Sequence, residues 1–242
     1  SRAEQSRAEQ SRAEQSRARY LDIAKGIGIT LVVFGHLSAR EQILRILIYS
    51  FHMPLFFIIS GSLNRKSTIS QTLKKGIYKL VIPTYQILAF DIVIRVFKII
   101  IMGKGYPSFS EWINGLLIHG GILWNAPVWF LMTLFICKLV NGIFEALNEK
   151  LLIVFVISCI FICTFNFNVR FPQWWLTNTV MSFPFFWVGV QDNHYNIIKQ
   201  YIKRENKSFI ILSIIWIVVA CWNGYTDINI QSNGKNYVLF LF

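Results

Sequence analysis

Residues 43–63 read ILRILIYSFHMPLFFIISGSL, an almost unbroken apolar run. A helix needs about 20 predominantly apolar residues to cross the hydrocarbon core of a bilayer. Comparable runs recur at about 21–38, 77–102, 127–147, 151–167, 176–190 and 208–223, and another begins at Tyr237. The sequence therefore predicts an all-α fold, a polytopic transmembrane helix bundle with about seven or eight helices present.

The composition supports a membrane protein and argues against the other classes that a basic chain suggests. Hydrophobic residues make up 54% of the 242 residues and charged residues 15%, whereas a soluble domain carries about 25% charged residues. The net charge of +12 comes from basic clusters between apolar runs, so membrane topology explains it and no nucleic-acid partner is expected. The four cysteines lie inside apolar runs without a neighbouring His or acidic residue, so neither a disulfide nor a metal site is predicted.

The basic residues also predict an orientation. Lys and Arg concentrate in the N-terminal tail, in the loop 64–76 and in the stretch 191–207, whereas the alternate connections carry few. The positive-inside rule then places the N-terminus in the cytoplasm. Within the third run, Asp91 and Arg95 are spaced i, i+4 and are expected to pair.

The N-terminal residues 1–19 repeat the unit SRAEQ and precede the predicted membrane domain, residues 20–242. This polar segment is expected to be a cytoplasmic tail, either disordered or a weakly formed solvated helix. A tandem array of the DNA unit AGCAG encodes the same peptide in every reading frame, so we hypothesise a slippable tract that switches expression. Because the chain starts with Ser and stops inside an apolar run, we expect a fragment truncated at the C-terminus.

Three ionisable residues in the first apolar run are functional candidates, because charge inside a membrane segment is costly. Asp22 and Lys25 are spaced i, i+3 and can pair, and His36 lies eleven residues beyond Lys25. This spacing puts Lys25 and His36 roughly on one helix face, about 16 Å apart along the axis. His36 could act as a general base for a hydroxyl, or it could be an interfacial histidine with satisfied hydrogen bonds.

Three further positions carry alternatives. His52 lies in the middle of the second run and is expected to face the bundle interior, in a structural or a substrate-binding role. Ser60–Gly61 favours close helix packing over a nucleophile. Trp129, at the start of the fourth run, could stack on a sugar ring or anchor the helix at the membrane interface.

Four stretches occur in the order of a known family's motifs: YLDIAKGIGITLVVFGH (20–36), FHMPLFFIISGSL (51–63), KLVIPTY (79–85) and PVWFLMTLF (127–135). Together they resemble the acyltransferase-3 family of membrane O-acyltransferases. That family has a basic residue, ten intervening residues and a histidine on its first helix, and Lys25 and His36 match this spacing with Lys in place of the commoner Arg. The resemblance implies about ten helices in the intact protein.

The resemblance also implies the chemistry. It makes His36 the essential catalytic residue, with Lys25 and Asp22 organising the first helix or the donor path. The family's arginine motif, thought to meet acyl-CoA, is replaced here by Lys74, Lys75 and Lys79, which lack the bidentate fork of arginine. A cationic cluster still suits the phosphates of coenzyme A.

The expected function is therefore acyl transfer, most simply of acetyl from acetyl-CoA to a hydroxyl of a cell-surface polysaccharide or lipid-linked sugar. No bound cofactor or metal is expected, and the expected location is the bacterial inner membrane. The rival interpretation is a transporter or flippase of a sugar-linked lipid, which would also be polytopic with charged residues inside the membrane. Transporters commonly show an internal repeat, and the LDIAKGIGIT…GH pattern occurs once.

Overall fold

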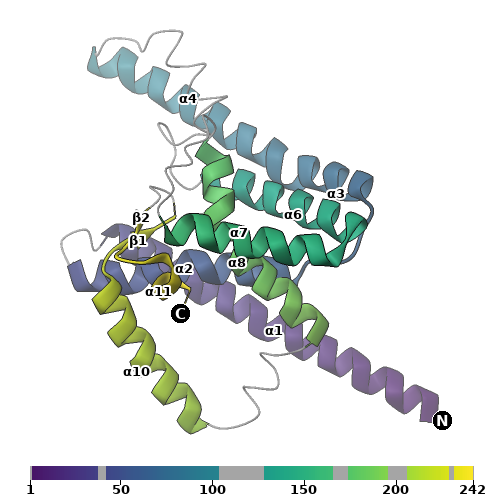
Figure 1. The fold of residues 1–242 in the computed structure, drawn as a ribbon. Coiled ribbons are helices and arrows are strands. Elements are labelled where there is room, and N and C mark those ends of the chain that lie inside the picture. Colours follow the sequence, from purple (N-terminus) through teal and green to yellow (C-terminus); the bar gives the residue numbers. More distant parts are fainter. Residues whose placement is uncertain are drawn as a thin grey trace.

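The computed structural model describes residues 2–37, 42–103, 128–165, 174–195, 206–228 and 232–241, and most of them are helical (Figure 1). The predicted all-α fold is confirmed. Strands β1 (Thr226–Asp227) and β2 (Ser232–Asn233) add a short antiparallel pair between two helices. The helical elements are, in chain order, α1 (Arg2–Leu37), α2 (Gln42–Ser62), α3 (Ile69–Gly76), the π-helix η1 (Ile77–Val81), α4 (Ile82–Met102), α6 (Trp129–Leu147), α7 (Glu149–Thr164), α8 (Trp174–Tyr195), α10 (Asn206–Asn223) and α11 (Tyr237–Phe240).

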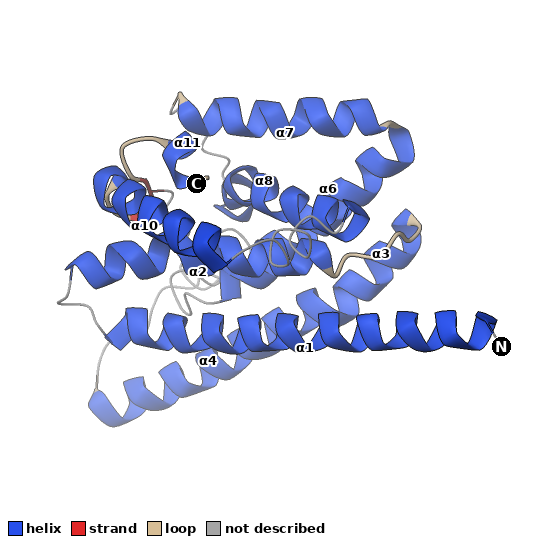
Figure 2. Cartoon of the chain, turned by 90° about the horizontal axis from the view of Figure 1, so that it is seen from below, coloured by secondary structure: helices blue, strands red, loops and turns tan. Residues whose placement is uncertain are grey.

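Two boundaries differ from those expected from the sequence. The predicted loop 64–76 is wrong in its second half, because α3 begins at Ile69 and continues through η1 into α4. Thr68 caps this helix, its hydroxyl accepting a hydrogen bond from the backbone N–H of Gln71 at 3.3 Å. At the N-terminus α1 runs through the repeat, so the helical alternative for residues 2–19 is the one observed. Figure 2 shows this half of α1 projecting beyond the bundle.

The core lies around α8, which packs against α2, α6 and α7. Helices α2 and α8 touch backbone to backbone at a pair of glycines, Gly61 and Gly189. A Cβ on Gly61 would overlap the carbonyl oxygen of Phe186, and one on Gly189 would overlap that of Ile58. The predicted packing role of Gly61 is thereby confirmed. Phenylalanine rings fill the space beside this contact, with Phe57, Phe183 and Phe186 fully buried.

The outward surface fits a lipid environment. Within the described residues, three helical runs are long and apolar enough to cross a membrane, Gln42–Ser62, Ile69–Ile101 and Trp129–Leu147, and Ile211–Asn223 is a shorter apolar helix. Helix α4 leaves the bundle beyond η1 (Figure 1) and exposes large apolar side chains such as Phe90, Phe97 and Ile101. Such a continuous apolar surface is costly in water and is solvated by lipid. The chain is therefore a multi-pass membrane protein.

Helix ends expected on the same side of the membrane meet in space. Ser62, at the end of α2, donates a hydrogen bond to buried Asp192 near the end of α8 at 3.3 Å. Arg45, in the first turns of α2, meets Tyr225 just beyond α10. These contacts agree with the predicted alternation of the helices across the bilayer. Which end faces the cytoplasm stays a prediction.

Candidate functional site

The charged pair predicted on the first helix is present. Lys25 Nζ lies 3.1 Å from Asp22 Oδ1, and the side chains are 37% and 71% exposed, respectively. His36 lies in the last turn of the same unbroken helix, so the expected rise of about 16 Å and rotation of about 20° between Lys25 and His36 hold for the backbone. The side chain of His36 lies outside the described part of the structure, as does that of Arg95, the expected partner of Asp91.

Glycines bring the His36 end of α1 against α2. A Cβ on Gly35 would lie 3.1 Å from Ile48 Cγ2 and 3.2 Å from Tyr49 Cε2, which is tighter than ordinary contact. A Cβ on Gly28 would lie 2.9 Å from the ring of Phe56. The helix-packing role of small residues in membranes explains this approach. It follows that the backbone preceding His36 lies beside Tyr49.

His52 points into the bundle, as predicted, and is 5% exposed. Its Nδ1 lies 2.7 Å from the carbonyl oxygen of Ile48. A carbonyl only accepts, so Nδ1 carries the proton and donates it. The edge of the ring meets Tyr49 with centroids 4.9 Å apart and planes at 80°. The choice between a structural and a substrate-binding role for His52 stays open.

A polar cluster beside His52 escaped the sequence analysis. Arg45 donates to the hydroxyl of Tyr225 at 3.2 Å, and that hydroxyl donates to Asp227 Oδ2 at 2.9 Å. The guanidinium also lies over the rings of Tyr225 and Tyr49, 4.9 and 5.8 Å from their centroids. Burial raises the pKa of Tyr225, and the carboxylate of Asp227 raises it further. The signal in the sequence was Arg45 itself, a charge inside the apolar run 43–63.

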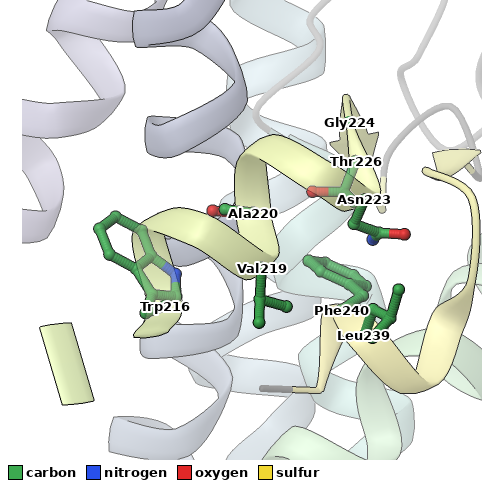
Figure 3. A pocket seen from close by; sticks show the side chains of 9 residues that line it. Trp216, Val219, Ala220, Asn223, Gly224, Thr226, Leu239 and Phe240 are labelled. Carbon is green, nitrogen blue, oxygen red and sulfur yellow. The ribbon is translucent and has the colours of Figure 1, made fainter. Parts of the chain in front are cut away.

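A pocket adjoins this cluster (Figure 3). Its walls come from α2, α10, β1 and α11, and include Ser50, Trp216, Asn223, Thr226 and Phe240. It contains about 230 Å³ of space, counting the part open to the outside. The hydroxyl of Thr226 is buried and lacks a hydrogen-bond partner within the described residues. The pocket is mostly apolar with a polar end near Tyr225, which suits a ligand with both characters.

Trp129 is placed by the structure in the core. As the first residue of α6 it is 3% exposed, and its ring lies 6.4 Å from that of Phe57 and 6.3 Å from that of Phe130. Packing against these rings accounts for a tryptophan at this position. Neither a membrane surface nor a pocket described here reaches it, although its assigned part in substrate binding stays untested.

The basic residues expected to meet the donor lie on a helix rather than in a loop. Lys74 and Lys75 occupy the last turn of α3, Lys79 lies in η1, and all three are exposed. Gly76 lets η1 approach α6, because a Cβ there would come within 2.6 Å of the ring of Phe135. Within the described residues, no group of three or more His, Cys, Asp or Glu side chains comes close enough to hold a metal ion.

The fold and these two ends of the bundle define a class: a polytopic membrane protein with a charged pair and a histidine along its first helix and a cationic helix on one side. The model of the acyltransferase-3 family, described as an acyltransferase domain, matches residues 18–242, and the chain belongs to that family. It is therefore a membrane acyltransferase. Comparison with curated proteins and with solved structures gave no match.

Proposed function

We propose that this acyltransferase moves an acetyl group from acetyl-CoA to a hydroxyl of a cell-surface polysaccharide or a lipid-linked sugar. The observation that carries the proposal is the first helix, on which the Asp22–Lys25 pair and His36 share one face of an unbroken helix in a chain of this family. The proposed location is the bacterial inner membrane with the N-terminus in the cytoplasm.

His36 is the proposed general base. Its imidazole takes the proton of the acceptor hydroxyl while that oxygen attacks the thioester carbonyl carbon. A new C–O bond forms, and the C–S bond then breaks as the tetrahedral intermediate collapses. The thiolate of coenzyme A leaves and takes the proton from the imidazolium, so His36 is regenerated. No oxidant, reductant or metal enters this sequence.

The basic residues of α3 and η1 are the proposed donor contacts. Lys74, Lys75 and Lys79 attract the phosphates of coenzyme A as point charges. Their exposure leaves them accessible to a soluble donor. Lys25, held by Asp22, is proposed to organise the first helix between the donor end and the His36 end.

The acceptor is proposed to lie at the His36 end. His52 supports this, because it is buried beside Tyr49, the residue on which Gly35 packs. The pocket next to Tyr225 offers apolar walls and a buried hydroxyl, features that suit a glycolipid acceptor. Trp129 was assigned to this task as well, but its burial among Phe57 and Phe130 favours packing.

The test uses the complete gene in a host that lacks its own copy. We would compare the wild type with His36→Ala and with His194→Ala, a control histidine in the last turn of α8, and measure ester-linked acetyl on purified surface glycan. We expect acetyl with the wild type and with the control, and none with His36→Ala at equal protein level. Acetylation that survives His36→Ala would remove the assigned base. No acetyl from any of the three would count against the glycan acceptor.

A further inference from the structure

The feature that the proposed mechanism leaves unused is Lys138. It is the central residue of α6 (Trp129–Leu147) and is half-buried. A lysine inside a membrane helix is costly and marks a functional position by default. The sequence analysis did not single it out.

Neighbouring contacts fix the direction in which Lys138 faces. Phe135, three residues before it, packs against Gly76, and Gly142, four residues after it, lies 3.7 Å from Thr72 when its Cβ is built. Residues spaced three and four apart share a helix face. Lys138 therefore lies on the side of α6 that packs against α3 and η1.

Two positive charges meet at this interface. Lys79 belongs to η1, and its charge lies close enough to that of Lys138 for the two to repel. Neither lysine makes an ion pair with a carboxylate within the described part of the chain. Glu145 shares the face of Lys138 but lies two turns farther along α6, about 10 Å away. Like charges without a counterion are stabilised by a bound anion.

A second, independent observation points the same way. Asn141, one turn beyond Lys138 on α6, is fully buried, and neither its Oδ1 nor its Nδ2 has a hydrogen-bond partner within the described residues. A buried carboxamide normally has partners, so an unpartnered one calls for a bound group. Its Nδ2 donates and would suit a phosphate oxygen. The π-turn of η1 beside it is a helix irregularity that is frequent at functional sites.

We propose that Lys138, Lys79 and Asn141 form a phosphate-binding site between α6 and the π-turn. On the proposed function, that phosphate belongs to the acyl-CoA donor. The site extends the exposed cluster of Lys74 and Lys75 into the bundle. It makes Lys138 a binding residue that positions the donor and takes no part in proton transfer.

The test measures ligand binding by the full-length protein in detergent. Isothermal titration with coenzyme A would compare the wild type with Lys138→Met, Lys138→Arg and Lys98→Met, a control at an exposed lysine of α4. We expect at least a tenfold weaker affinity for Lys138→Met, partial recovery for Lys138→Arg and no change for Lys98→Met. Because Lys138→Met removes a like-charge contact, its melting temperature without ligand should equal or exceed that of the wild type.

The outcomes separate this site from the proposed function. Wild-type affinity in Lys138→Met would overturn the site while leaving acyl-CoA as donor. Binding of inorganic pyrophosphate that depends on Lys138, without binding of coenzyme A, would support the site and overturn the donor. If the wild type binds neither probe, both are overturned.

Discussion

At the scale of residues, the contact that holds the end of α10 to α2 is the chain from Arg45 through Tyr225 to Asp227. Its members are 180 residues apart, and no local spacing rule links them. By contrast, the pair of Asp22 and Lys25 was predictable, because residues three apart on a helix are neighbours. Local pairs can be read from a sequence, whereas contacts between distant helices depend on packing.

The first prediction concerns Tyr225→Phe. Removing the hydroxyl deletes one hydrogen bond to a carboxylate and one from a guanidinium, so we expect a loss of about 1–3 kcal/mol in the free energy of unfolding. The measurement is the melting temperature in detergent. Tyr78→Phe, at an exposed tyrosine of η1, is the control and should be neutral. Equal effects of the two substitutions would contradict a structural role for the cluster.

The second prediction is the pH dependence of that difference. Burial and Asp227 raise the pKa of Tyr225 above the usual value of about 10, so the folded state favours the protonated phenol. This contribution is fully present below the unfolded pKa and is lost as the pH rises through the folded pKa. The stability gap between wild type and Tyr225→Phe should therefore stay constant from about pH 7 to 9 and shrink above about pH 10. A gap that shrinks already near neutrality would argue against the raised pKa.

At the scale of elements, apolar runs predicted most of the helices. The second run was expected at 43–63, and α2 occupies Gln42–Ser62. Helix α3 was missed because its eight residues are mainly polar and only the cap at Thr68 announces it. The π-turn at Ile77–Val81 was missed as well, since it depends on how the helix packs against α6 and on no local pattern.

The third prediction tests the closest helix contact. Gly189→Ala would push a methyl group into the backbone of α2, so we expect a loss of about 1–3 kcal/mol or more and a lower yield of folded protein. Gly26→Ala is the matched control, because nothing lies within 4 Å of a Cβ at Gly26. It should be neutral or stabilising by up to about 1 kcal/mol. The measurement is the fraction of monodisperse protein after heating in detergent. If Gly189→Ala behaves like Gly26→Ala, α2 and α8 do not approach as closely as described.

At the scale of the whole molecule, the alternation of helix ends is visible but its absolute direction is a prediction. Cysteines introduced at exposed Lys66 and Lys235 should lie on opposite sides of the membrane. In a Cys221→Ser background, which removes the exposed native thiol, a membrane-impermeant maleimide should label Lys235→Cys in intact cells and Lys66→Cys only after the membrane is opened. The reverse pattern would place the N-terminus outside and would contradict a cytoplasmic donor site.

The central claim is acyl transfer from acyl-CoA with His36 as base, and its most direct test is the transfer itself. Isotope-labelled acetyl-CoA would be added to membranes that contain the full-length protein or His36→Ala together with the acceptor glycan. The account predicts base-labile label in the glycan fraction with the wild type and none above background with His36→Ala. Undiminished transfer by His36→Ala would contradict the assigned base. Absence of transfer by the wild type, in membranes whose glycan is acetylated in the cell, would contradict acetyl-CoA as the donor.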